Sequence, residues 1–377
     1  MLQPLSKASV KNKRVLVRVD YNLSYDSRAH KIGSAFRVSQ TKKTIDYLIQ
    51  KNPQYVLLLS HFGRPEAYSA DQSLKLLLPI IRQTLKRKIA FLDYRQDISS
   101  LKNELKPGNI YLLDNLRFWP GENHNDAKFA KQLAKLGDIF INEAFSVSHR
   151  KTASISAITK YLPAYQGFHL QAEIAALDKF LRFQAKPFFV ILGGAKIADK
   201  LGMLNTLIPK ADAVLLGGGP ANTFIAQKGY PIGNSLQELL TPQGEKLLAS
   251  KKIILPIDWK VLRQEKIIPV PLEDVEARDV IVDIGPRTAT LYAQLISEAK
   301  RVFFNGPLGK SENLAEAALG TVKTLKAIPA TCFALAGGGD TGSFIEKHKL
   351  ENKFDYLSTA GGATLAYLSG ESLPGLK

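Results

Sequence analysis

Short apolar runs alternate along this chain with longer segments in which apolar residues recur every three or four positions. The short runs favour buried β-strands and the longer segments favour amphipathic helices, because side chains repeat every two residues in a strand and every 3.6 in a helix. The predicted strands are 15–19, 56–60, 89–92, 110–113, 139–142, 188–192, 213–216, 253–255, 302–304, 332–335 and 356–358. The predicted helices are 44–50, 74–85 with a kink or break at Pro79, 126–136, and others that begin near Ala195, Pro220, Thr341 and Ala363.

This alternation predicts an α/β protein. Near-continuous apolar strands separated by helices are typical of parallel sheets that are covered by helices on both faces. A chain of 377 residues is longer than one ordinary core supports, so we expect two domains. The segment 162–167, which contains Pro and Gly, marks the division, and the pattern of 170–183 predicts a connecting helix. We therefore expect an N-terminal domain over 1–165, a connecting helix over 166–183 and a C-terminal domain over 184–364.

Composition places the chain among ordinary globular proteins, with 45% hydrophobic and 23% charged residues. No apolar run approaches the roughly 20 residues that a membrane span requires, and the first residues lack the apolar core of a secretory signal. The cysteine Cys332 lies in an apolar run, has no second cysteine to pair with and fits a reducing compartment. We therefore expect a cytoplasmic protein that has no membrane partner.

The net charge of +17 is concentrated in the first part of the chain. Residues 1–165 hold 27 Lys and Arg against 13 Asp and Glu, whereas residues 166–377 hold 24 against 21. A basic surface attracts anions and speeds their arrival, although solvated lysines account for most of this excess. A nucleic-acid partner is one alternative, but the chain has no basic stretch interleaved with stacking aromatics and no known nucleic-acid motif.

The basic half places polar side chains directly after its predicted strands. Asp20 and Asn22 follow the first strand and His61 follows the second. Ligands of parallel sheets bind where the strands end, and arginine grips phosphate and carboxylate oxygens in bidentate fashion. The predicted anion site comprises Asp20, Asn22, Arg37, His61, Arg64, Arg117, His149 and Arg150.

The second half places glycine clusters at the corresponding points. They are GGAK at 193–196, GGGP at 217–220, GGGD at 337–340 and AGGA at 360–363. Glycine turns at helix starts present backbone N–H groups to phosphates, although glycine also serves plain tight turns. Lys196 and Lys200 are spaced to share one face of a helix start. Asp340, beside Thr341, is either a helix N-cap or a Mg²⁺ ligand.

The two halves together predict a protein that moves a phosphoryl group between a small polyanion and a nucleotide. The chain contains no GxxxxGK[ST] sequence, which excludes a P-loop enzyme, and the spacing of GGGP does not match a dinucleotide fingerprint. No Ser/His/Asp set and no convincing catalytic base stands out.

Eleven strings in order narrow this prediction to one family. They are VLVRVDYN, SHFGRP, LLDNLRFWPGENHND, INEAFSVSHR, FFVILGGAKIADK, GGGPANTF, DIGPRT, NGPLG, GGGDT, STAGGA and the final LPG. In these strings the chain resembles phosphoglycerate kinases over essentially its whole length. The resemblance implies two Rossmann-like three-layer αβα domains with parallel sheets, joined by an interdomain helix and a hinge, with a tail over 365–377 packing back on the first domain. It also implies a monomer that reversibly converts 1,3-bisphosphoglycerate and MgADP into 3-phosphoglycerate and MgATP.

The resemblance also implies roles for individual positions. The positions implied to bind 3-phosphoglycerate or 1,3-bisphosphoglycerate are Asp20, Tyr21, Asn22, Arg37, His61, Phe62, Gly63, Arg64, Arg117, His149 and Arg150. Those implied to bind ATP or ADP are Gly193, Lys200, Gly217, Gly218, Asn305, Pro307, Glu312, Gly338, Gly339, Asp340 and Thr341. Asp340 would also bind Mg²⁺, and Glu312 would bind the ribose. The positions implied to hold the phosphoryl group in transit are Arg37, Lys196, Gly361 and Gly362.

The implied acceptor is a carboxylate, which is ionised at neutral pH and needs no general base. Catalysis would then rest on positioning and charge neutralisation, and closure of the two domains would expel water. The positions that depart from the family pattern are Glu143, Ser146, Thr152, Ile281, Lys310, Ser311, Ala360 and Ala366. They predict an altered rate or purine preference, and they leave open a binding protein that kept the fold and lost the transfer.

Overall fold

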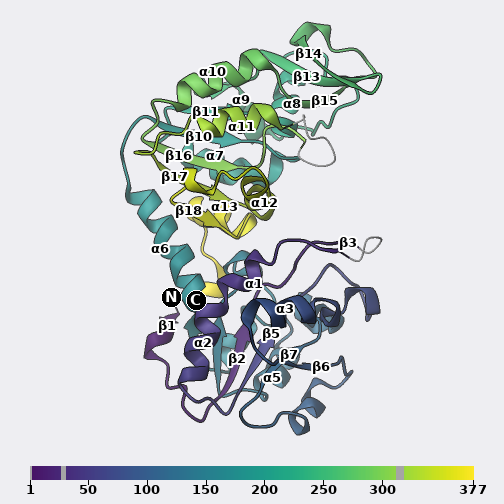
Figure 1. Ribbon diagram of the computed structural model, residues 1–377, viewed down its shortest axis with the longest axis vertical. Helices are drawn as coiled ribbons and strands as arrows, with labels where there is room; N and C mark the ends of the chain where they lie inside the picture. Colours follow the sequence, from purple (N-terminus) through teal and green to yellow (C-terminus); the bar gives the residue numbers. More distant parts are fainter. Residues whose placement is uncertain (1, 27–30, 311–317) are drawn as a thin grey trace. The chain divides into compact units, whose positions relative to one another are not determined.

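A computed structural model describes residues 2–26, 31–310 and 318–377 (Figure 1). The chain divides into two units, of which unit 1 comprises Met1–Ala175 with Ser372–Lys377 and unit 2 comprises Ala176–Glu371. Each unit is an α/β fold around a parallel sheet, as the alternation of strands and helices predicted. Among the described residues, no helix combines the length and the apolar character that crossing a membrane requires.

Unit 1 is built on a seven-stranded parallel sheet in the order β1-β9-β8-β2-β5-β7-β6. Its strands are β1 (Gln3–Pro4), β2 (Arg14–Arg18), β5 (Tyr55–Leu59), β6 (Ala90–Leu92), β7 (Ile110–Leu113), β8 (Ile139–Asn142) and β9 (Ala164–Gln166). A separate antiparallel pair is formed by β3 (Tyr25–Asp26) and β4 (Lys31–Ile32). Because β2 pairs in parallel with β5 and β8, the residues that follow these three strands gather at one edge of the sheet.

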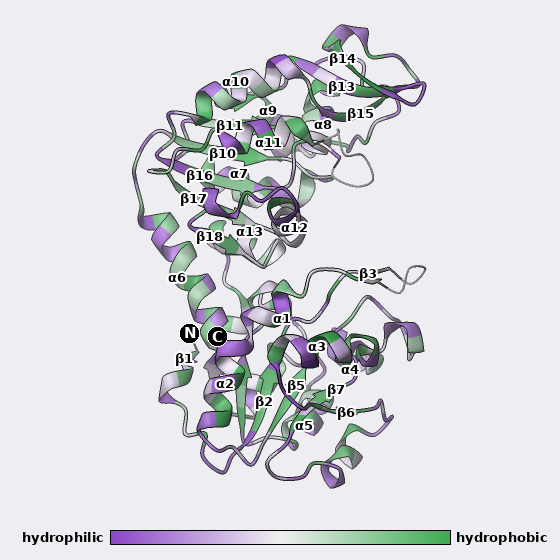
Figure 2. Ribbon diagram, in the orientation of Figure 1, coloured by the Kyte–Doolittle hydropathy of each residue, from purple (hydrophilic) through white to green (hydrophobic). Residues whose placement is uncertain are grey.

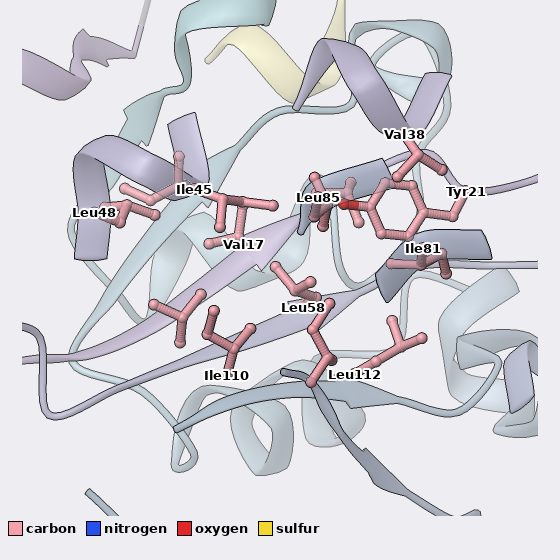
Figure 3. Close-up of a cluster of buried hydrophobic side chains, with 14 of the residues drawn as sticks. Val17, Tyr21, Val38, Ile45, Leu48, Leu58, Ile81, Leu85, Ile110 and Leu112 are labelled. Carbon is pink, nitrogen blue, oxygen red and sulfur yellow. The ribbon is translucent and has the colours of Figure 1, made fainter. Parts of the chain in front are cut away.

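Successive side chains of these strands enter two different hydrophobic cores. Val15 and Val17 of β2 belong to the first core, and Leu16 between them belongs to the second. The helices of unit 1 are α1 (Phe36–Gln40), α2 (Lys42–Gln50), α3 (Leu78–Leu85), α4 (Pro120–Asn123) and α5 (Ala127–Ala134). Residues of α1, α2 and α3 close the first core, which Figure 3 shows, and residues of α5 close the second. The strands are therefore apolar on both faces, as the green colour of β2 and β5 in Figure 2 shows.

The helix predicted over 74–85 is divided in the structure. A 3₁₀ turn over Leu74–Leu77 precedes α3, and Pro79 stands in the first turn of α3. Proline is tolerated there because the first turn of a helix needs no backbone donor. The break expected at Pro79 is therefore confirmed.

Unit 2 contains a six-stranded parallel sheet in the order β12-β11-β10-β16-β17-β18. Its strands are β10 (Phe188–Leu192), β11 (Ala213–Leu216), β12 (Ile253–Ile254), β16 (Arg301–Asn305), β17 (Phe333–Gly337) and β18 (Tyr356–Ser358). The strands predicted in this half therefore lie within two residues of those observed. The glycine clusters at 193–196 and 217–220 follow β10 and β11, and the cluster at 337–340 begins with the last residue of β17, so all three lie at the carboxyl ends of strands.

A second, antiparallel sheet in unit 2 was not expected from the sequence. It consists of β13 (Asp258–Arg263), β14 (Lys266–Pro271) and β15 (Val280–Ile284) in the order β14-β13-β15. The turn between β13 and β14 is formed by Gln264 and Glu265, whose φ angles are +48° and +64°. The usual residues of such a two-residue turn are Asn-Gly or Asp-Gly, and neither pair occurs at positions 264 and 265. The hairpin therefore lacks its usual signal in the sequence.

The helices of unit 2 begin close to three of the four predicted starts. They are α7 (Leu201–Leu207), α8 (Gly218–Gln227), α9 (Pro242–Leu248), α10 (Pro286–Ile296), α11 (Leu319–Lys326), α12 (Gly339–Lys347) and α13 (Gly362–Leu368). The start predicted near Ala195 is wrong, because α7 begins at Leu201 after a 3₁₀ turn over Ala198–Lys200. The backbone amides of Ile197 and Ala198 donate to the Glu238 carboxylate instead of entering a helix.

The connecting helix is α6 (Phe168–Arg182), and the boundary between the two units falls inside it, after Ala175. This boundary lies within the range 166–183 that we expected for the connecting helix, and α6 is divided between the two units. The first turns of α6 belong to unit 1 because Phe168 packs edge-on against Tyr47, with ring centroids 5.0 Å apart, and contributes to the first core.

The tail that packs on unit 1 is shorter than the 365–377 we expected. Residues 365–371 belong to unit 2, since α13 packs against α7 there. Only Ser372–Lys377 joins unit 1. Gly375 anchors it, because its N–H donates to Ser148 O over 2.9 Å and its carbonyl accepts from Asn142 Nδ2 over 2.8 Å.

Candidate active site

Asp20 is the centre of the polar network at the strand ends of unit 1. Its Oδ2 accepts hydrogen bonds from Arg37 Nη1, over 2.9 Å, and from the Ser146 hydroxyl. Its Oδ1 accepts from the Asn22 backbone N–H over 3.1 Å. Burial would raise the pKa of the Asp20 carboxyl, but the charge of Arg37 and the Ser146 hydrogen bond outweigh it and lower that pKa. Asp20 is therefore a buried carboxylate that draws Arg37 to the strand ends.

The turn at Gly63 connects the polar groups that follow β2, β5 and β7. Its N–H donates to Asn22 Oδ1 over 2.9 Å, and its carbonyl accepts from the Arg117 guanidinium. Gly63 has a φ of +60°, a conformation that a larger residue adopts only with strain. Asn115 supports the same turn through bonds with the backbone of Phe62. The predicted residues Asn22, Gly63 and Arg117 are thus brought together.

Positive charge accumulates in this site beyond what its carboxylates balance. Burial and the charges of Arg150, Arg18 and Arg64 lower the pKa of the Arg117 guanidinium to about 10. Burial and the charge of Arg64 likewise lower the pKa of Arg150. Arginines that depress one another's pKa lie close enough to repel, so a bound polyanion would relieve this repulsion.

Burial disfavours the charged form of both histidines of this site. Burial and the nearby arginines hold the pKa of His61 well below its ordinary value. Burial and the charge of Arg150 lower the pKa of His149 to about 4. His149 Nδ1 is buried and has no hydrogen-bond partner among the described residues. The environment of both rings therefore favours the neutral imidazole over the imidazolium.

Two residues that the resemblance placed in the substrate site have their side chains in the core. Tyr21 is fully buried in the first core (Figure 3), and its hydroxyl lies 2.8 Å from Thr41 Oγ1. Phe62 is buried in the same core and packs edge-on against Tyr25. Because an aromatic ring after a strand satisfies the apolar pattern equally well, sequence position alone does not distinguish these two uses. Their side chains position the backbone beside the site.

The glycines that follow β10 and β11 serve close backbone packing. The Gly193 N–H donates to Asn305 O over 3.1 Å, Gly217 N–H to Leu192 O over 2.9 Å, and Gly218 N–H to Leu308 O over 2.7 Å. A Cβ at Gly193 would lie 2.1 Å from the Pro307 carbonyl oxygen. The expectation that these amides are available to phosphates is therefore wrong for these three glycines. Their contribution is the close approach of these loops, since a Cβ at Gly217 or Gly218 would also lie within 3 Å of a neighbouring residue.

Lys196 and Lys200 do not share a helix face, which corrects the sequence prediction. Lys196 stands in the loop after β10 and its side chain is exposed. Lys200 is buried at the end of the 3₁₀ turn, and its Nζ donates to the Lys196 carbonyl oxygen over 2.8 Å. The two lysines are therefore joined through the backbone of this loop. The loop begins with a turn at Gly194, which has a φ of +84°.

The segment after β17 forms the start of α12 and contacts the loop after β16. Gly338, with a φ of +115°, precedes α12, and Thr341 Oγ1 accepts from the Gly306 N–H over 2.9 Å. Asn305 Nδ2 donates to Gly337 O over 2.5 Å. Asp340 is exposed in the first turn and makes no N-cap bond, so the capping alternative is wrong. Gly339 lies in the same turn, which presents its first amides and one carboxylate together.

The remaining predicted positions divide into two groups. Gly361 precedes α13 and Gly362 begins it, beside a buried pair formed by Ser358 Oγ and Thr364 Oγ1, 2.7 Å apart. Glu312 lies outside the described residues. Within the described part of the chain, no group of three or more His, Cys, Asp or Glu side chains is arranged to hold a metal ion.

Several contacts of the site were missed in the sequence. Arg18 and Glu122 are ionisable yet buried. Arg18 lies within the apolar run 15–19, which was the available signal, whereas Glu122 lies among polar residues and had no such signal. Ser146 and Glu238 reach their partners across 126 and 41 residues of sequence respectively, and no local pattern indicates such contacts.

Comparison with known proteins identifies the family. The sequence model described as phosphoglycerate kinase matches residues 5–371. The chain is 39% identical to a phosphoglycerate kinase of Wolbachia pipientis, over 97% of this chain and 96% of that protein, and 36% identical to one of Coprothermobacter proteolyticus, over 100% and 98%. The crystal structure of phosphoglycerate kinase from Pyrococcus horikoshii superposes with a TM-score of 0.87 at 29% identity, covering 100% of this chain and 98% of that one. The chain therefore belongs to the phosphoglycerate kinase family.

Proposed function

We propose that this chain binds 3-phosphoglycerate or 1,3-bisphosphoglycerate on unit 1 and binds ATP or ADP, with Mg²⁺, on unit 2. The chain transfers a phosphoryl group between 1,3-bisphosphoglycerate and ADP, as its family membership entails. The observation that carries the assignment of unit 1 is its cluster of mutually repelling arginines at the strand ends. Substrates that carry a carboxylate and one or two phosphates supply the missing negative charge.

On unit 1, charge and hydrogen bonding are divided between two kinds of residue. Arg64, Arg117 and Arg150 supply the positive charge that attracts the phosphate and carboxylate of the substrate. Asp20 and Asn22, fixed by the bonds described above, orient hydroxyl and arginine groups. His61 and His149 contribute as neutral imidazoles, and Gly63 supplies the turn. The side chains of Tyr21 and Phe62 support this arrangement from the core.

On unit 2, the loops after β10, β11 and β16 and the start of α12 receive the nucleotide. Gly193, Gly217 and Gly218 shape this part of the site by letting the loops pack closely, because a Cβ at each would lie within 3 Å of a neighbouring residue. Lys200, the loop of Asn305 and Pro307, and the first turn of α12 face the phosphates in our proposal. The residues of that turn are Gly338, Gly339, Asp340 and Thr341. Glu312, outside the described residues, is proposed to bind the ribose.

Asp340 has the chemistry of a Mg²⁺ ligand in such a site. Its carboxylate is exposed and is not used as a helix cap, and Mg²⁺ takes one or two carboxylates together with substrate phosphates. When bound, the ion supplies positive charge to the phosphate oxygens. The donor set of unit 2 therefore fits this ion without a cage made wholly of protein ligands.

Transfer itself requires positioning and charge, and no general base. The carboxylate of 3-phosphoglycerate is ionised at neutral pH and attacks directly. Arg37 and Lys196 neutralise the charge on the phosphoryl oxygens, and the amides at Gly361 and Gly362 orient the group in line. Arg37 reaches the phosphoryl group by exchanging its Asp20 partner for a phosphate oxygen, since the same Nη1 makes both bonds in this proposal.

The test is a coupled assay of acyl phosphate formation from 3-phosphoglycerate with ATP and, separately, with GTP. We expect turnover with ATP and its loss on addition of excess EDTA. Binding of both substrates without turnover would instead identify a protein that kept the fold and lost the transfer. We further propose a cytoplasmic monomer, and sedimentation at micromolar concentration tests the single-chain state.

A further inference from the structure

Four buried polar side chains form a continuous hydrogen-bonded chain beneath the substrate site of unit 1. Glu122, Ser154, Arg18 and His61 are each at most 4% exposed. Glu122 Oε1 accepts from the Ser154 hydroxyl over 2.6 Å, and Ser154 Oγ accepts from Arg18 Nε over 2.9 Å. Arg18 Nη2 lies 3.2 Å from His61 Nδ1. The chain thus extends from a carboxylate in α4 to an imidazole that follows β5.

The direction of every bond in this chain is fixed by its two ends. A carboxylate only accepts and a guanidinium only donates. Glu122 Oε2 also accepts from the Ser154 backbone N–H over 2.9 Å, so both carboxylate oxygens turn the serine towards Glu122. The Ser154 proton therefore points to Glu122, and its oxygen lone pairs are left for Arg18.

His61 Nδ1 must then be the acceptor of the Arg18 bond. Asp20 Oδ1 lies 4.0 Å from the same nitrogen, which is too long for a hydrogen bond that would require a proton there. The groups whose charges act on the ring are Asp20, Arg18, Arg117 and Arg150, and the arginines together with burial disfavour the imidazolium. The single proton of the neutral ring consequently resides on Nε2.

We propose that Glu122 and Ser154 are positioning residues for substrate binding, which act through Arg18 to hold His61 as the Nε2–H tautomer. In this form His61 offers a directional donor to a substrate oxygen without adding a further positive charge to the arginine cluster. The assignment rests on the proposed role of His61 in binding 3-phosphoglycerate. It adds two residues, from α4 and from the loop after β8, that touch no substrate atom in the proposal.

The first test needs no substitution. Long-range ¹H–¹⁵N correlation spectra of the full-length protein, labelled with ¹⁵N-histidine, distinguish protonated from unprotonated ring nitrogens. The chain has six histidines, and loss of one signal set in His61→Asn assigns His61. We expect the neutral Nε2–H pattern between pH 6 and 8. A proton on Nδ1, or an imidazolium at pH 7, overturns the proposal directly.

The second test breaks the chain at Ser154. In Ser154→Ala, Arg18 Nε loses its acceptor, so the Nδ1–H tautomer becomes populated and the KM for 3-phosphoglycerate rises about tenfold while kcat changes less than about twofold. Ser154→Thr, which keeps a hydroxyl, should restore the wild-type tautomer. Ser156→Ala is the matched control, because Ser156 is only half-buried and takes no part in the hydrogen bonds that link Glu122 to His61.

The outcomes separate this inference from the proposed function. An unchanged tautomer in Ser154→Ala overturns the proposal, whether or not the KM rises, because a raised KM alone would show a merely structural role. Absence of turnover in the wild-type protein would contradict the proposed function, whereas the spectrum of His61 would still decide the tautomer.

Discussion

At the scale of the residue, Arg37 is held by two oxygens, since its Nη1 donates to Asp20 Oδ2 over 2.9 Å and to the Asn22 carbonyl oxygen over 3.1 Å. Asp20 Oδ2 accepts from both Arg37 and Ser146, and the resemblance places glycine, which has no hydroxyl, at position 146. The Ser146 hydroxyl weakens the hydrogen bond between Arg37 and Asp20 Oδ2, because both donors share the lone pairs of that oxygen. We therefore propose that Ser146 eases the exchange in which Arg37 leaves Asp20 for a phosphate oxygen.

Replacement of Arg37 tests its role in the transfer step. In Arg37→Ala we expect kcat to fall about 30- to 1,000-fold, since a charged donor to the transition state contributes about 2–4 kcal/mol. The KM for 3-phosphoglycerate should change far less. Steady-state kinetics measure both constants, and Lys42→Ala, which removes a half-exposed ion pair with Asp46 on the next helix, is the control. An unchanged kcat would contradict the role assigned to Arg37.

Replacement of Lys200 tests nucleotide binding on unit 2. In Lys200→Ala we expect the KM for ATP to rise about tenfold, because one charge-assisted bond to a phosphate is lost. In our proposal Lys200 binds the nucleotide and does not hold the phosphoryl group in transit, so kcat should fall by a smaller factor than the KM rises. Lys210→Ala, at an exposed position, controls for the loss of one positive charge. Equal kcat/KM in both variants would exclude Lys200 from the site.

At the scale of the element, α6 is fixed at its start by a buried acid. Glu143 follows β8, and its Oε1 accepts from Thr44 Oγ1 over 2.5 Å and from the His169 N–H over 3.1 Å. A Cβ at Gly167 would lie 1.8 Å from Glu143 Oε2, so glycine is required at the entry to the helix. Burial raises the pKa of Glu143 to about 8 despite these donors. The first turn of α6 is therefore tied to the sheet of unit 1 by a group that titrates near neutrality.

The stability of unit 1 should consequently depend on the protonation of Glu143. Between its ordinary pKa of 4.5 and its folded value of about 8, the folded state retains a proton that the unfolded state has released. The contribution of Glu143 to stability is thus complete at low pH and falls by about 1.4 kcal/mol per pH unit as the pH rises through this window. Glu143→Gln, which cannot ionise, should lose this slope and be the more stable variant above pH 8.

Denaturant unfolding at pH 6, 7, 8 and 9 measures this slope. A Trp259→Phe background leaves Trp119 as the fluorescent reporter of unit 1, because the chain has two tryptophans and Trp259 lies in unit 2. Asp46→Asn, at a surface acid of the same unit, is the control. If the free energy of unfolding of unit 1 changes with pH equally in Glu143→Gln and in its background, Glu143 is not the source of the pH dependence.

At the scale of the whole molecule, the last residues of the chain complete a unit that the first residues begin. The Leu2 N–H donates to Leu376 O over 3.0 Å, and Leu373, Gly375 and Leu376 are buried. Gly375 is needed because a Cβ there would lie 2.8–2.9 Å from Ile155 and Ser148. The core of unit 1 is therefore completely packed only after unit 2 has been synthesised.

Removal of residues 372–377 should therefore destabilise unit 1 and leave unit 2 unaffected. We expect a loss of about 2–5 kcal/mol in the unfolding of unit 1, because two buried leucines and their hydrogen bonds are lost. Fluorescence of Trp119 in a Trp259→Phe background reports the unfolding of unit 1, and fluorescence of Trp259 in a Trp119→Phe background reports the unfolding of unit 2. Removal of the exposed Lys377 alone should change neither transition. A shift confined to Trp259 would contradict this account.

The sequence by itself determined the parallel sheets, because apolar runs of four or five residues between amphipathic segments have few other ways to be buried. It also determined which strand ends carry arginine and which carry glycine, since the chain order of strand, loop and helix is local information. The hairpin over β13 and β14 was missed, because Gln264 and Glu265 adopt positive φ angles without the residues that usually signal them.

Only the tertiary structure decided what each polar group does. The amides of Gly193 and Gly217 donate to carbonyls at the ends of strands β16 and β10, and the amide of Gly218 donates to Leu308 O. Lys196 and Lys200 are joined through a backbone carbonyl and not across a helix face. The tautomer of His61 depends on Glu122, which lies 61 residues away in the sequence. Burial and partners across such separations set protonation and hydrogen bonding, and neither quantity is encoded in local periodicity.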